Sequence, residues 1–454
     1  MARFPIRPIK IYRRARRTGQ LQASPPAILA SSFGILILLG TILLALPISQ
    51  RKPFGLFEAF FTATSSVTVT GLTIIDPIHD LSFFGQAVML GLVQIGGIGF
   101  VTFAIIAAVT LGKRVSLKYQ ALALEAFNQT SMQRVRSTAF TVLKFSLAIE
   151  GAAMLVLTLW WWRHDRLEHA FLMAGFHVVS AFNNAGLTLF PDSLASFSGD
   201  PVTTFVLTFC VILGGLGFSV LADIYNKRAW TTLSYYTRLM ILGTLLLNLC
   251  GLVLFWLIEA GNPFTLGPLP VANQGLAAWT QIISARTAGF ASVDIDQLRD
   301  SSRFLLVGLM FIGGGSLSTA SGIKLGTFII LMAVVRSYIR QRKEVVLMNR
   351  TISPESIHKA LALLMVSALL VCIGIFAVSL LENLPFISIV MEVMSAFSTT
   401  GLSPELTPAL SRPSQILLMM LMLVGRLGPL TLVYNLGTQR HSRVRHAEIP
   451  IQVG

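Results

Sequence analysis

Apolar runs long enough to cross a membrane recur along the chain, and they come in pairs. A membrane-spanning helix needs roughly 20 mostly apolar residues. Within each pair the connecting segment is half apolar and carries a patch of small residues that ends in glycine, whereas the connections between pairs are basic. The pattern predicts eight membrane helices, near residues 26–47, 83–111, 138–162, 202–222, 237–259, 304–335, 358–381 and 414–436.

The composition excludes a soluble protein. Of the 454 residues, 54% are hydrophobic and only 12% are charged, and the mean hydropathy is +0.72. So little charge cannot cover so much apolar surface in water, so we interpret the chain as a polytopic membrane protein. The first apolar run follows a basic stretch but is too long for a signal peptide, and we expect it to remain as the first helix.

The net charge of +15 indicates topology and does not predict nucleic-acid binding. Most Lys and Arg residues lie in the N-terminal stretch, in the connections between pairs and at the C-terminus, whereas Asp and Glu favour the segments within pairs. Cytoplasmic loops of membrane proteins carry the excess of Lys and Arg. We therefore expect both termini in the cytoplasm, the segments within pairs outside, and no nucleic-acid partner.

Two short patterns each occur four times in the same register. The first is a string of small residues that ends in glycine and one apolar residue: "SSVTVTGL" (65–72), "SAFNNAGL" (180–187), "ISARTAGF" (283–290) and "SAFSTTGL" (395–402). Shortly after each comes a glycine-rich patch: "IGGIG" (95–99), "LGGLG" (213–217), "IGGGS" (312–316) and "VGRLG" (424–428). Two markers at near-constant spacing predict four repeats.

Each repeat contains a short apolar stretch before the first marker, such as "GLFEAFFTATSSV" (55–67). It is too short to span a bilayer and too apolar for an ordinary loop, which predicts a helix that enters from outside and returns. The expected fold is all-α, with four fused helix–pore-helix–helix repeats around a pseudo-fourfold pore. The expected parts are a basic cytoplasmic N-terminus (1–25), pore repeats at 26–111, 138–226, 234–342 and 356–437, and a cytoplasmic C-terminal tail (438–454).

Non-helical backbone at membrane depth is tolerated only where it is buried in protein or lines a water-filled path. The C-terminal end of each short helix carries a partial negative charge, and backbone carbonyls can replace the hydration shell of an ion. Glycine can adopt the positive φ that aims consecutive carbonyls the same way. Since no carboxylate lies in these strings, we expect a monovalent cation, K⁺, at the carbonyls of Thr70, Ala185, Ala288 and Thr400. The alternative is that the glycines only permit close packing. The candidate selectivity-filter residues are Thr68, Val69, Thr70, Gly71, Asn183, Asn184, Ala185, Gly186, Arg286, Thr287, Ala288, Gly289, Ser398, Thr399, Thr400 and Gly401.

The four-unit plan, the filter strings and "VGRLGPLTL" (424–432) resemble the Trk/Ktr/HKT superfamily of potassium transporters, most closely the KtrB membrane subunits of bacterial Ktr systems. The resemblance covers nearly the whole chain. It implies K⁺ uptake across the bacterial cytoplasmic (inner) membrane, possible dependence on Na⁺, and a homodimer. It also implies a cytosolic ring of nucleotide-binding regulatory subunits of the KtrA or KtrC type, so that any nucleotide binds the partner.

The second helix of the third repeat differs from the others because five glycines lie in "FIGGGSLSTASGIKLGTF" (311–328). Each interior glycine costs about 1 kcal/mol of helix propensity, so we expect a break with a loop over about Gly313–Gly326, beneath the filter. The alternative is a kinked packing helix; the resemblance supports a gating loop. The candidate gate residues are Gly313, Gly314, Gly315, Ser316, Ser318, Thr319, Ser321, Gly322, Lys324 and Arg426.

Three charged residues of the predicted membrane helices need an explanation, and Arg286 in the third string is a fourth case. Arg426 aligns with Gly97, Gly215 and Gly314, and a cation inside a membrane helix must face the bundle interior or water. We expect it on the pore axis near the loop, or else in a buried ion pair. Lys324 either reaches the inner surface or holds the loop closed. Glu150 is either structural or an ion-coupling site.

Arg286 stands where the sister strings have Thr68, Asn183 and Ser398. A cationic head in the ion path would repel K⁺, so we expect this side chain behind the filter, in a buried network with an acidic partner.

Two other function classes compete with a channel-like pore. A secondary transporter with a site in broken helices is the alternative, but it favours inverted repeats and intramembrane carboxylates, and these repeats run in one direction. An enzyme needs a clustered constellation of reactive side chains, and none is visible in the sequence.

Overall fold

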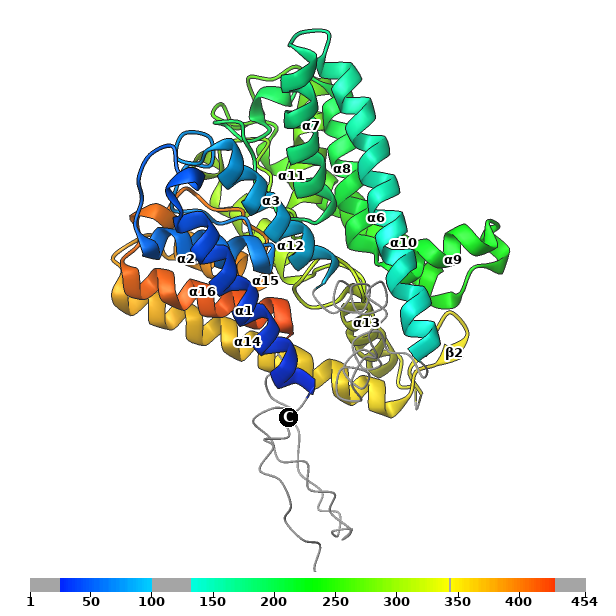
Figure 1. Ribbon diagram of the computed structural model, residues 1–454. Coiled ribbons are helices and arrows are strands. Elements are labelled where there is room, and N and C mark those ends of the chain that lie inside the picture. Colours follow the sequence, from blue (N-terminus) through cyan, green and yellow to red (C-terminus); the bar gives the residue numbers. More distant parts are fainter. Residues whose placement is uncertain (1–24, 100–131, 343, 429–454) are drawn as a thin grey trace, which may run out of the picture.

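The computed structural model describes residues 25–99, 132–342 and 344–428, and these are mostly helical (Figure 1). A two-stranded antiparallel hairpin, β1 (Val346–Leu347) and β2 (Arg350–Thr351), joins the last two units. The α-helices are α1 (Pro25–Ala45), α2 (Leu56–Thr68), α3 (Phe83–Ile98), α6 (Met132–Trp161), α7 (Leu167–Phe182), α8 (Pro201–Leu216), α9 (Phe218–Lys227), α10 (Tyr235–Glu259), α11 (Val271–Ala285), α12 (Asp300–Phe311), α13 (Leu325–Ile339), α14 (Pro354–Leu381), α15 (Phe386–Ser398) and α16 (Arg412–Leu427).

These helices form four units of the same plan, each with an outer helix, a short helix and a second helix. Unit one is α1–α2–α3, unit two α6–α7–α8, unit three α10–α11–α12 and unit four α14–α15–α16, and within each unit all three helices touch one another. The short helices have 13 residues in α2, 16 in α7, 15 in α11 and 13 in α15. They are too short to span a bilayer, and their C-terminal halves are buried.

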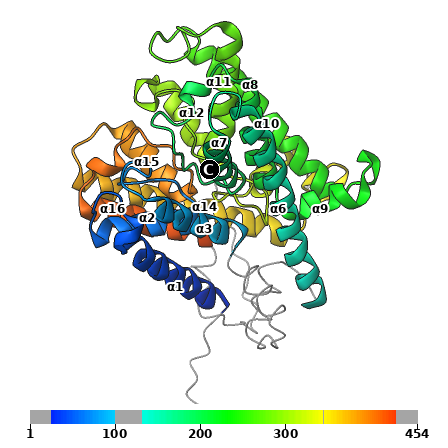
Figure 2. The ribbon, with the colours of Figure 1, turned by 45° about the horizontal axis from the view of Figure 1, so that its top comes forward.

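Contacts between units close a ring. The second helix of each unit packs against the short helix of the next: α3 on α7, α8 on α11, α12 on α15, and α16 back on α2. In Figure 2 the four units, coloured from blue to orange along the chain, follow one another around a common centre. The four short helices therefore surround one axis.

Several helices begin where the sequence supplies a cap. The side chains of Ser82, Asp200, Ser234 and Ser353 accept hydrogen bonds from backbone N–H groups in the first turns of α3, α8, α10 and α14. Proline follows the cap in α8 and α14, where its missing N–H costs nothing. Local chemistry thus sets these helix starts.

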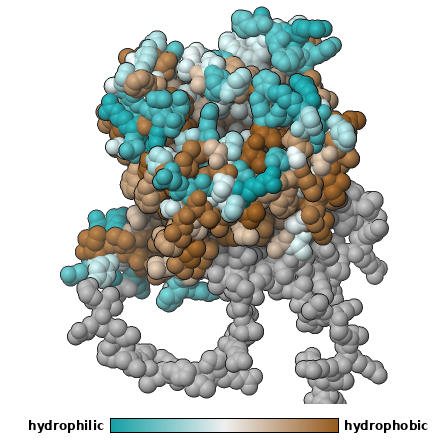
Figure 3. Space-filling model, turned by 90° about the vertical axis from the view of Figure 1, so that its left-hand side faces the viewer, coloured by the Kyte–Doolittle hydropathy of each residue, from teal (hydrophilic) through white to brown (hydrophobic). Residues whose placement is uncertain are grey.

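The outer helices present apolar side chains outward. By length and composition, α6, α10 and α14 are each able to cross a membrane, and Leu155, Leu246 and Phe376, one on each of them, are more than 60% exposed. A hydrophobic band covers one side of the molecule, with hydrophilic side chains gathered above it (Figure 3). A helix that is apolar on its outside faces lipid, so the chain is a multi-pass membrane protein.

The prediction of one unbroken helix over 202–222 was wrong. Helix α8 ends at Leu216, Gly217 has φ of 102°, and α9 leaves at 97°. The loop of unit three occupies the corner: Phe218 N–H donates to the carbonyl of Leu317 at 2.8 Å, and a Cβ on Gly217 would lie 2.5 Å from the carbonyl oxygen of Ser316. The bend makes room for that loop.

Two other second helices are shorter than the apolar runs suggested. Helix α3 ends before Gly99, with φ of 94°, and α16 ends before Gly428, with φ of 87°. Positive φ cannot continue a right-handed helix. The rest of the predicted spans, up to residues 111 and 436, lies outside the described residues.

The second helix of unit three is interrupted where the glycine content predicts a break. Helix α12 ends at Phe311 and α13 begins at Leu325. We call the residues between them, 312–324, the unit-three loop. Its two ends are joined, because Gly313 N–H donates to Ile323 and Ile323 N–H donates to Phe311, at 2.9 and 3.1 Å. The loop is therefore a closed irregular excursion.

Candidate functional site

Each short helix ends in the same four-residue turn. We number these turns by unit: turn one (68–71), turn two (183–186), turn three (286–289) and turn four (398–401). The second residue of each turn has left-handed backbone and the fourth is a glycine with positive φ. The φ values are 59° and 90° for Val69 and Gly71, 59° and 64° for Asn184 and Gly186, 70° and 89° for Thr287 and Gly289, and 49° and 90° for Thr399 and Gly401.

The positive φ of the glycines matches what the sequence predicts. In turns one, three and four the left-handed second residue does not follow from residue type, because Val and Thr rarely adopt this conformation, whereas Asn184 of turn two adopts it more readily. Such strain persists only where the surroundings overdetermine the backbone.

The four turns meet in a ring. A Cβ added to Gly71 would lie 2.1 Å from the carbonyl oxygen of Ala185, and one added to Gly186 would lie 2.6 Å from that of Ala288. A Cβ added to Gly289 would lie 2.2 Å from the carbonyl oxygen of Thr400. One added to Gly401 would lie 2.4 Å from that of Thr70, which completes the ring. The ring brings together the four carbonyls singled out from the sequence, and any side chain on a ring glycine would strike one of them.

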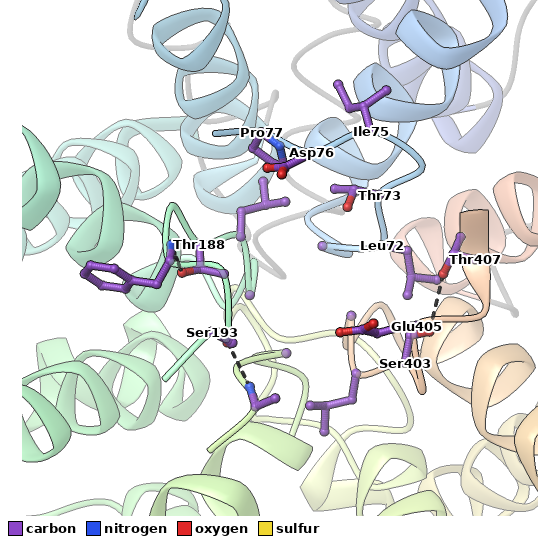
Figure 4. Close-up of a pocket in the computed structure, with 18 of the residues that line it drawn as sticks. Leu72, Thr73, Ile75, Asp76, Pro77, Thr188, Ser193, Ser403, Glu405 and Thr407 are labelled. Atoms are coloured by element: carbon purple, nitrogen blue, oxygen red, sulfur yellow. Dashed lines mark hydrogen bonds between the residues drawn. The ribbon is translucent and has the colours of Figure 1, made fainter. Parts of the chain in front are cut away.

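A pocket of about 410 Å³ opens above this ring, and all four glycines line it. Figure 4 shows segments of all four units around the pocket, in blue, green, yellow-green and orange. Asp76 and Glu405 contribute carboxylates to its lining. The ring thus lies at the floor of a mouth with acidic groups.

Turns one and four are braced by their own units. The Thr68 and Thr70 hydroxyls lie 2.8 Å apart, and those of Ser398 and Thr400 lie 2.7 Å apart. The N–H of each turn glycine donates to a serine hydroxyl of the preceding helix at 3.0 Å, Gly71 to Ser65 and Gly401 to Ser395. These braces span at most six residues.

Turn two has bonds within its own unit, from Ser180 Oγ to the carbonyl of Leu187 at 2.7 Å and from Asn183 Nδ2 to that of Val179 at 2.9 Å, and adds side chains from other helices. The Asn183 amide donates to Gln94 Oε1 of α3 at 2.5 Å, and Gln94 Nε2 donates to both oxygens of Glu150 of α6, at 3.0 and 2.9 Å. Glu150 is 6% exposed. This network favours the structural role of Glu150, since its carboxylate is occupied by amide donors.

Turn three is held by Arg286, which lies behind the ring as expected. Nη1 donates to Asn248 Oδ1 of α10 at 3.2 Å, and Nη2 donates to the carbonyl of Gly313 at 3.0 Å. The expected acidic partner was wrong: within the described ranges no carboxylate pairs with Arg286. Two neutral oxygens accept from Nη1 and Nη2 instead, while the buried Nε has no hydrogen-bond partner among the described residues.

The unit-three loop lies against turn two and the α8–α9 corner. The Thr319 hydroxyl is 3.1 Å from the carbonyl of Phe182 and 3.0 Å from Asn184 Oδ1. Gly315 N–H donates to the carbonyl of Gly215 at 2.8 Å. Inside the loop, Ser318 donates to Gly315 and Lys324 Nζ to Ala320, at 2.7 and 2.6 Å. The last contact favours the holding role of Lys324.

Arg426 of α16 binds the loop from the opposite side. It donates to the carbonyl of Thr319 and, at 2.6 and 3.0 Å, to the carbonyls of Gly96 and Gly97 at the end of α3. Over the part of the chain that the structure describes, it forms no ion pair with a carboxylate. Arg426 therefore links units one, three and four through backbone oxygens.

Known proteins resemble this chain in sequence and in fold. The family model for the cation transport protein TrkH matches residues 6–437. The chain belongs to this family. It is 42% identical over 431 residues to the Ktr system potassium uptake protein B of Bacillus subtilis, covering 95% of this chain and 97% of that protein. It is 37% identical over 456 residues to the protein of the same name from Vibrio alginolyticus, covering all of both chains.

A solved structure supports the TrkH-family fold. The potassium transporter TrkH of Vibrio parahaemolyticus superposes with a TM-score of 0.70 at 18% identity, covering 93% of this chain and 87% of that chain. At this identity the likeness concerns the fold alone. The expectation of an all-α membrane fold of this superfamily is confirmed.

Two residues that bond the turns of this TrkH-family chain, Gln94 and Asn248, were not predicted from the sequence. Gln94 and Asn248 lie in apolar helices, and neither stands within a marker string. A lone amide in a membrane helix is a weak signal, because such groups often bond across helices without any special role. Gln94 and Asn248 reach turns two and three only because α3 packs behind turn two and α10 behind turn three.

Proposed function

We propose that this chain takes up K⁺ through a pore whose narrowest part is the ring of turns one to four. One observation supports this most: four backbone carbonyls, one from each unit, meet at the C-terminal ends of four short helices. Carbonyl oxygens replace the water lost by a dehydrated monovalent cation, and the helix ends add partial negative charge. The names of the two Ktr relatives support K⁺ as the ion.

The chain's residues divide the task between entry and selection. Asp76 and Glu405 raise the local cation concentration at the outer pocket. The carbonyls of Thr70, Ala185, Ala288 and Thr400 then bind the ion, while side chains behind the turns hold them in place.

The unit-three loop is proposed as the gate below the ring. Contacts of Thr319 with turn two and of Arg426 with the loop hold it across the axis. Arg426 adds a positive charge that opposes K⁺. In this proposal the chain is a homodimer in the bacterial inner membrane, with both termini in the cytoplasm. A cytosolic ring of nucleotide-binding regulatory subunits changes shape with its nucleotide, pulls on the inner ends of the second helices and so moves the loop. Dependence of uptake on Na⁺ is a property to be tested in the same assays.

Complementation of a K⁺-uptake-deficient bacterium tests the proposal. The wild-type chain, expressed with a Ktr regulatory subunit, should restore growth at low K⁺, and Gly71→Ser and Gly289→Ser should weaken K⁺ affinity. Failure of the wild type, or unchanged affinity in both variants, contradicts the proposal. Deletion of Ser316–Ser321 tests the gate separately: uptake should rise, and an unchanged rate would remove the loop from gating.

A further inference from the structure

Turns two and three differ from turns one and four in touching the unit-three loop. Thr319 and Asn184 are each 1% exposed, and the Thr319 hydroxyl bonds the carbonyl of Phe182, where α7 ends, and Asn184 Oδ1, in turn two itself. The Asn184 amide nitrogen has no hydrogen-bond partner. Among the residues described, the side chain of Asn184 thus finds its hydrogen bond in the loop, whereas its backbone N–H donates to the carbonyl of Ala181 at 3.1 Å.

Turn three meets the other end of the same loop. Arg286 is 8% exposed, and one of its two hydrogen-bond acceptors is the carbonyl of Gly313, just after the break in α12. Hydrogen bonds from a charged donor are about twice as strong as neutral ones, and a buried charge that loses an acceptor must move or find another. Displacement of Gly313 would therefore shift Arg286, three residues before Gly289 in the ring.

We infer that the unit-three loop is part of the selectivity apparatus, with Thr319 and Arg286 as positioning residues that set turns two and three. Moving the loop releases these turns, while turns one and four keep their own braces. Ion selectivity then depends on the position of the loop. Because coupling between two sites is reciprocal, binding of a well-fitting ion in the ring also stabilises the loop position in which turns two and three are braced. This inference rests on the proposed function.

The test uses the full chain with its regulatory subunit in proteoliposomes, and measures Rb⁺ uptake in competition with K⁺ and with Na⁺. Thr319→Val keeps the shape of the side chain and removes the hydroxyl. It should reduce the preference for K⁺ over Na⁺ about five- to tenfold, the effect of one lost buried hydrogen bond. Thr319→Ser, which restores the hydroxyl, should return the preference to within about twofold of wild type.

Ser318→Ala is the matched control, because the Ser318 hydroxyl bonds only within the loop. It should keep the wild-type preference whatever its uptake rate. If Thr319→Val changes the rate but not the preference, the inference is overturned and the loop is a gate only.

Asn184→Leu removes the same contact from the side of the turn, and covers the case in which Thr319→Val does not fold. It should lower the preference as Thr319→Val does, and an unchanged preference overturns the inference. Absence of K⁺-selective uptake by the wild type would instead defeat the proposed function.

Discussion

Turns one and four and turns two and three reach the same backbone shape by different routes. In the first pair, hydroxyls within six residues along the chain hold the turn. In the second pair the bracing groups come from residues as distant as Gln94, Asn248 and Thr319. The ring therefore has two locally braced sides and two sides whose bracing also comes from the rest of the fold. A change elsewhere reaches the latter directly through their hydrogen bonds.

The largest expected effect comes from the ring itself. Gly71→Ala places a Cβ 2.1 Å from the carbonyl of Ala185 at a φ of 90°, and strain of about 1–3 kcal/mol should cut K⁺ uptake by about five- to 150-fold. Gly186→Ala keeps a clash, 2.6 Å from the carbonyl oxygen of Ala288, but its φ of 64° lies in the left-handed region open to other residues. Without the φ penalty of Gly71→Ala, it should do less harm. Uptake assays on both variants, at matched expression, check this order. Equal losses would show that the φ of the glycine does not decide how well turns one and two tolerate a side chain.

The next effect tests the brace of turn three. Arg286→Met keeps side-chain length but leaves the carbonyl of Gly313 and Asn248 Oδ1 without their charged donor, a loss of about 1.5–3 kcal/mol for each bond. We expect a lower thermal unfolding midpoint in detergent and weaker K⁺ selectivity, with no passage of larger cations. Arg286→Lys should recover part of the midpoint. A wild-type midpoint in Arg286→Met would show that the guanidinium does not hold turn three.

A smaller effect is expected behind turn two. Gln94→Leu removes the amide donor from the buried Glu150 carboxylate and leaves Asn183 Nδ2 with Val179 and a 3.4 Å contact to Glu150, at a cost of about 1–3 kcal/mol. It should lower the unfolding midpoint and selectivity together. Glu150→Gln keeps an acceptor and should be milder. If Glu150→Gln abolished ion-driven uptake while leaving the midpoint unchanged, Glu150 would be an ion-coupling site and its structural role would be secondary.

The smallest effect belongs to the locally braced turns. Thr68→Val removes one hydroxyl pair, worth about 0.5–1.5 kcal/mol. Thr68→Val should change selectivity by the same amount in a chain lacking residues 316–321 as in the full chain. The hydrogen bonds that brace turn one come from its own unit and include no residue of the loop. A strong dependence on the deletion, measured by the same ion competition, would mean that all four turns sense the loop.

The repeated markers allowed much of this fold to be predicted. Four glycines at fixed register located the turns, and glycine richness located the break between α12 and α13. The straight course expected for residues 202–222 was wrong because the obstacle at Gly217 is a loop that lies about 100 residues further along the chain. Hydropathy reports only local preference, so it cannot register such a neighbour.

The candidate site divides in the same way. Position in the repeat predicted that Arg286 points behind the ring, because a cation in an ion path would repel K⁺, and its side chain does bond to α10 and the unit-three loop. Its partners were not predictable, since a guanidinium accepts either carboxylates or neutral oxygens, and which of these lies within reach depends on how α10 and the loop pack.

By itself, the sequence determined the membrane class, the four units, the turn glycines and the break in unit three, because hydropathy, repeat spacing and glycine content act locally along the chain. Only the tertiary structure decided how the second helix of each unit meets the short helix of the next, and hence that the four carbonyls form a ring. It also decided that turns two and three are held by Gln94, Asn248 and Thr319, because hydrogen bonds between distant segments exist only after those segments have packed.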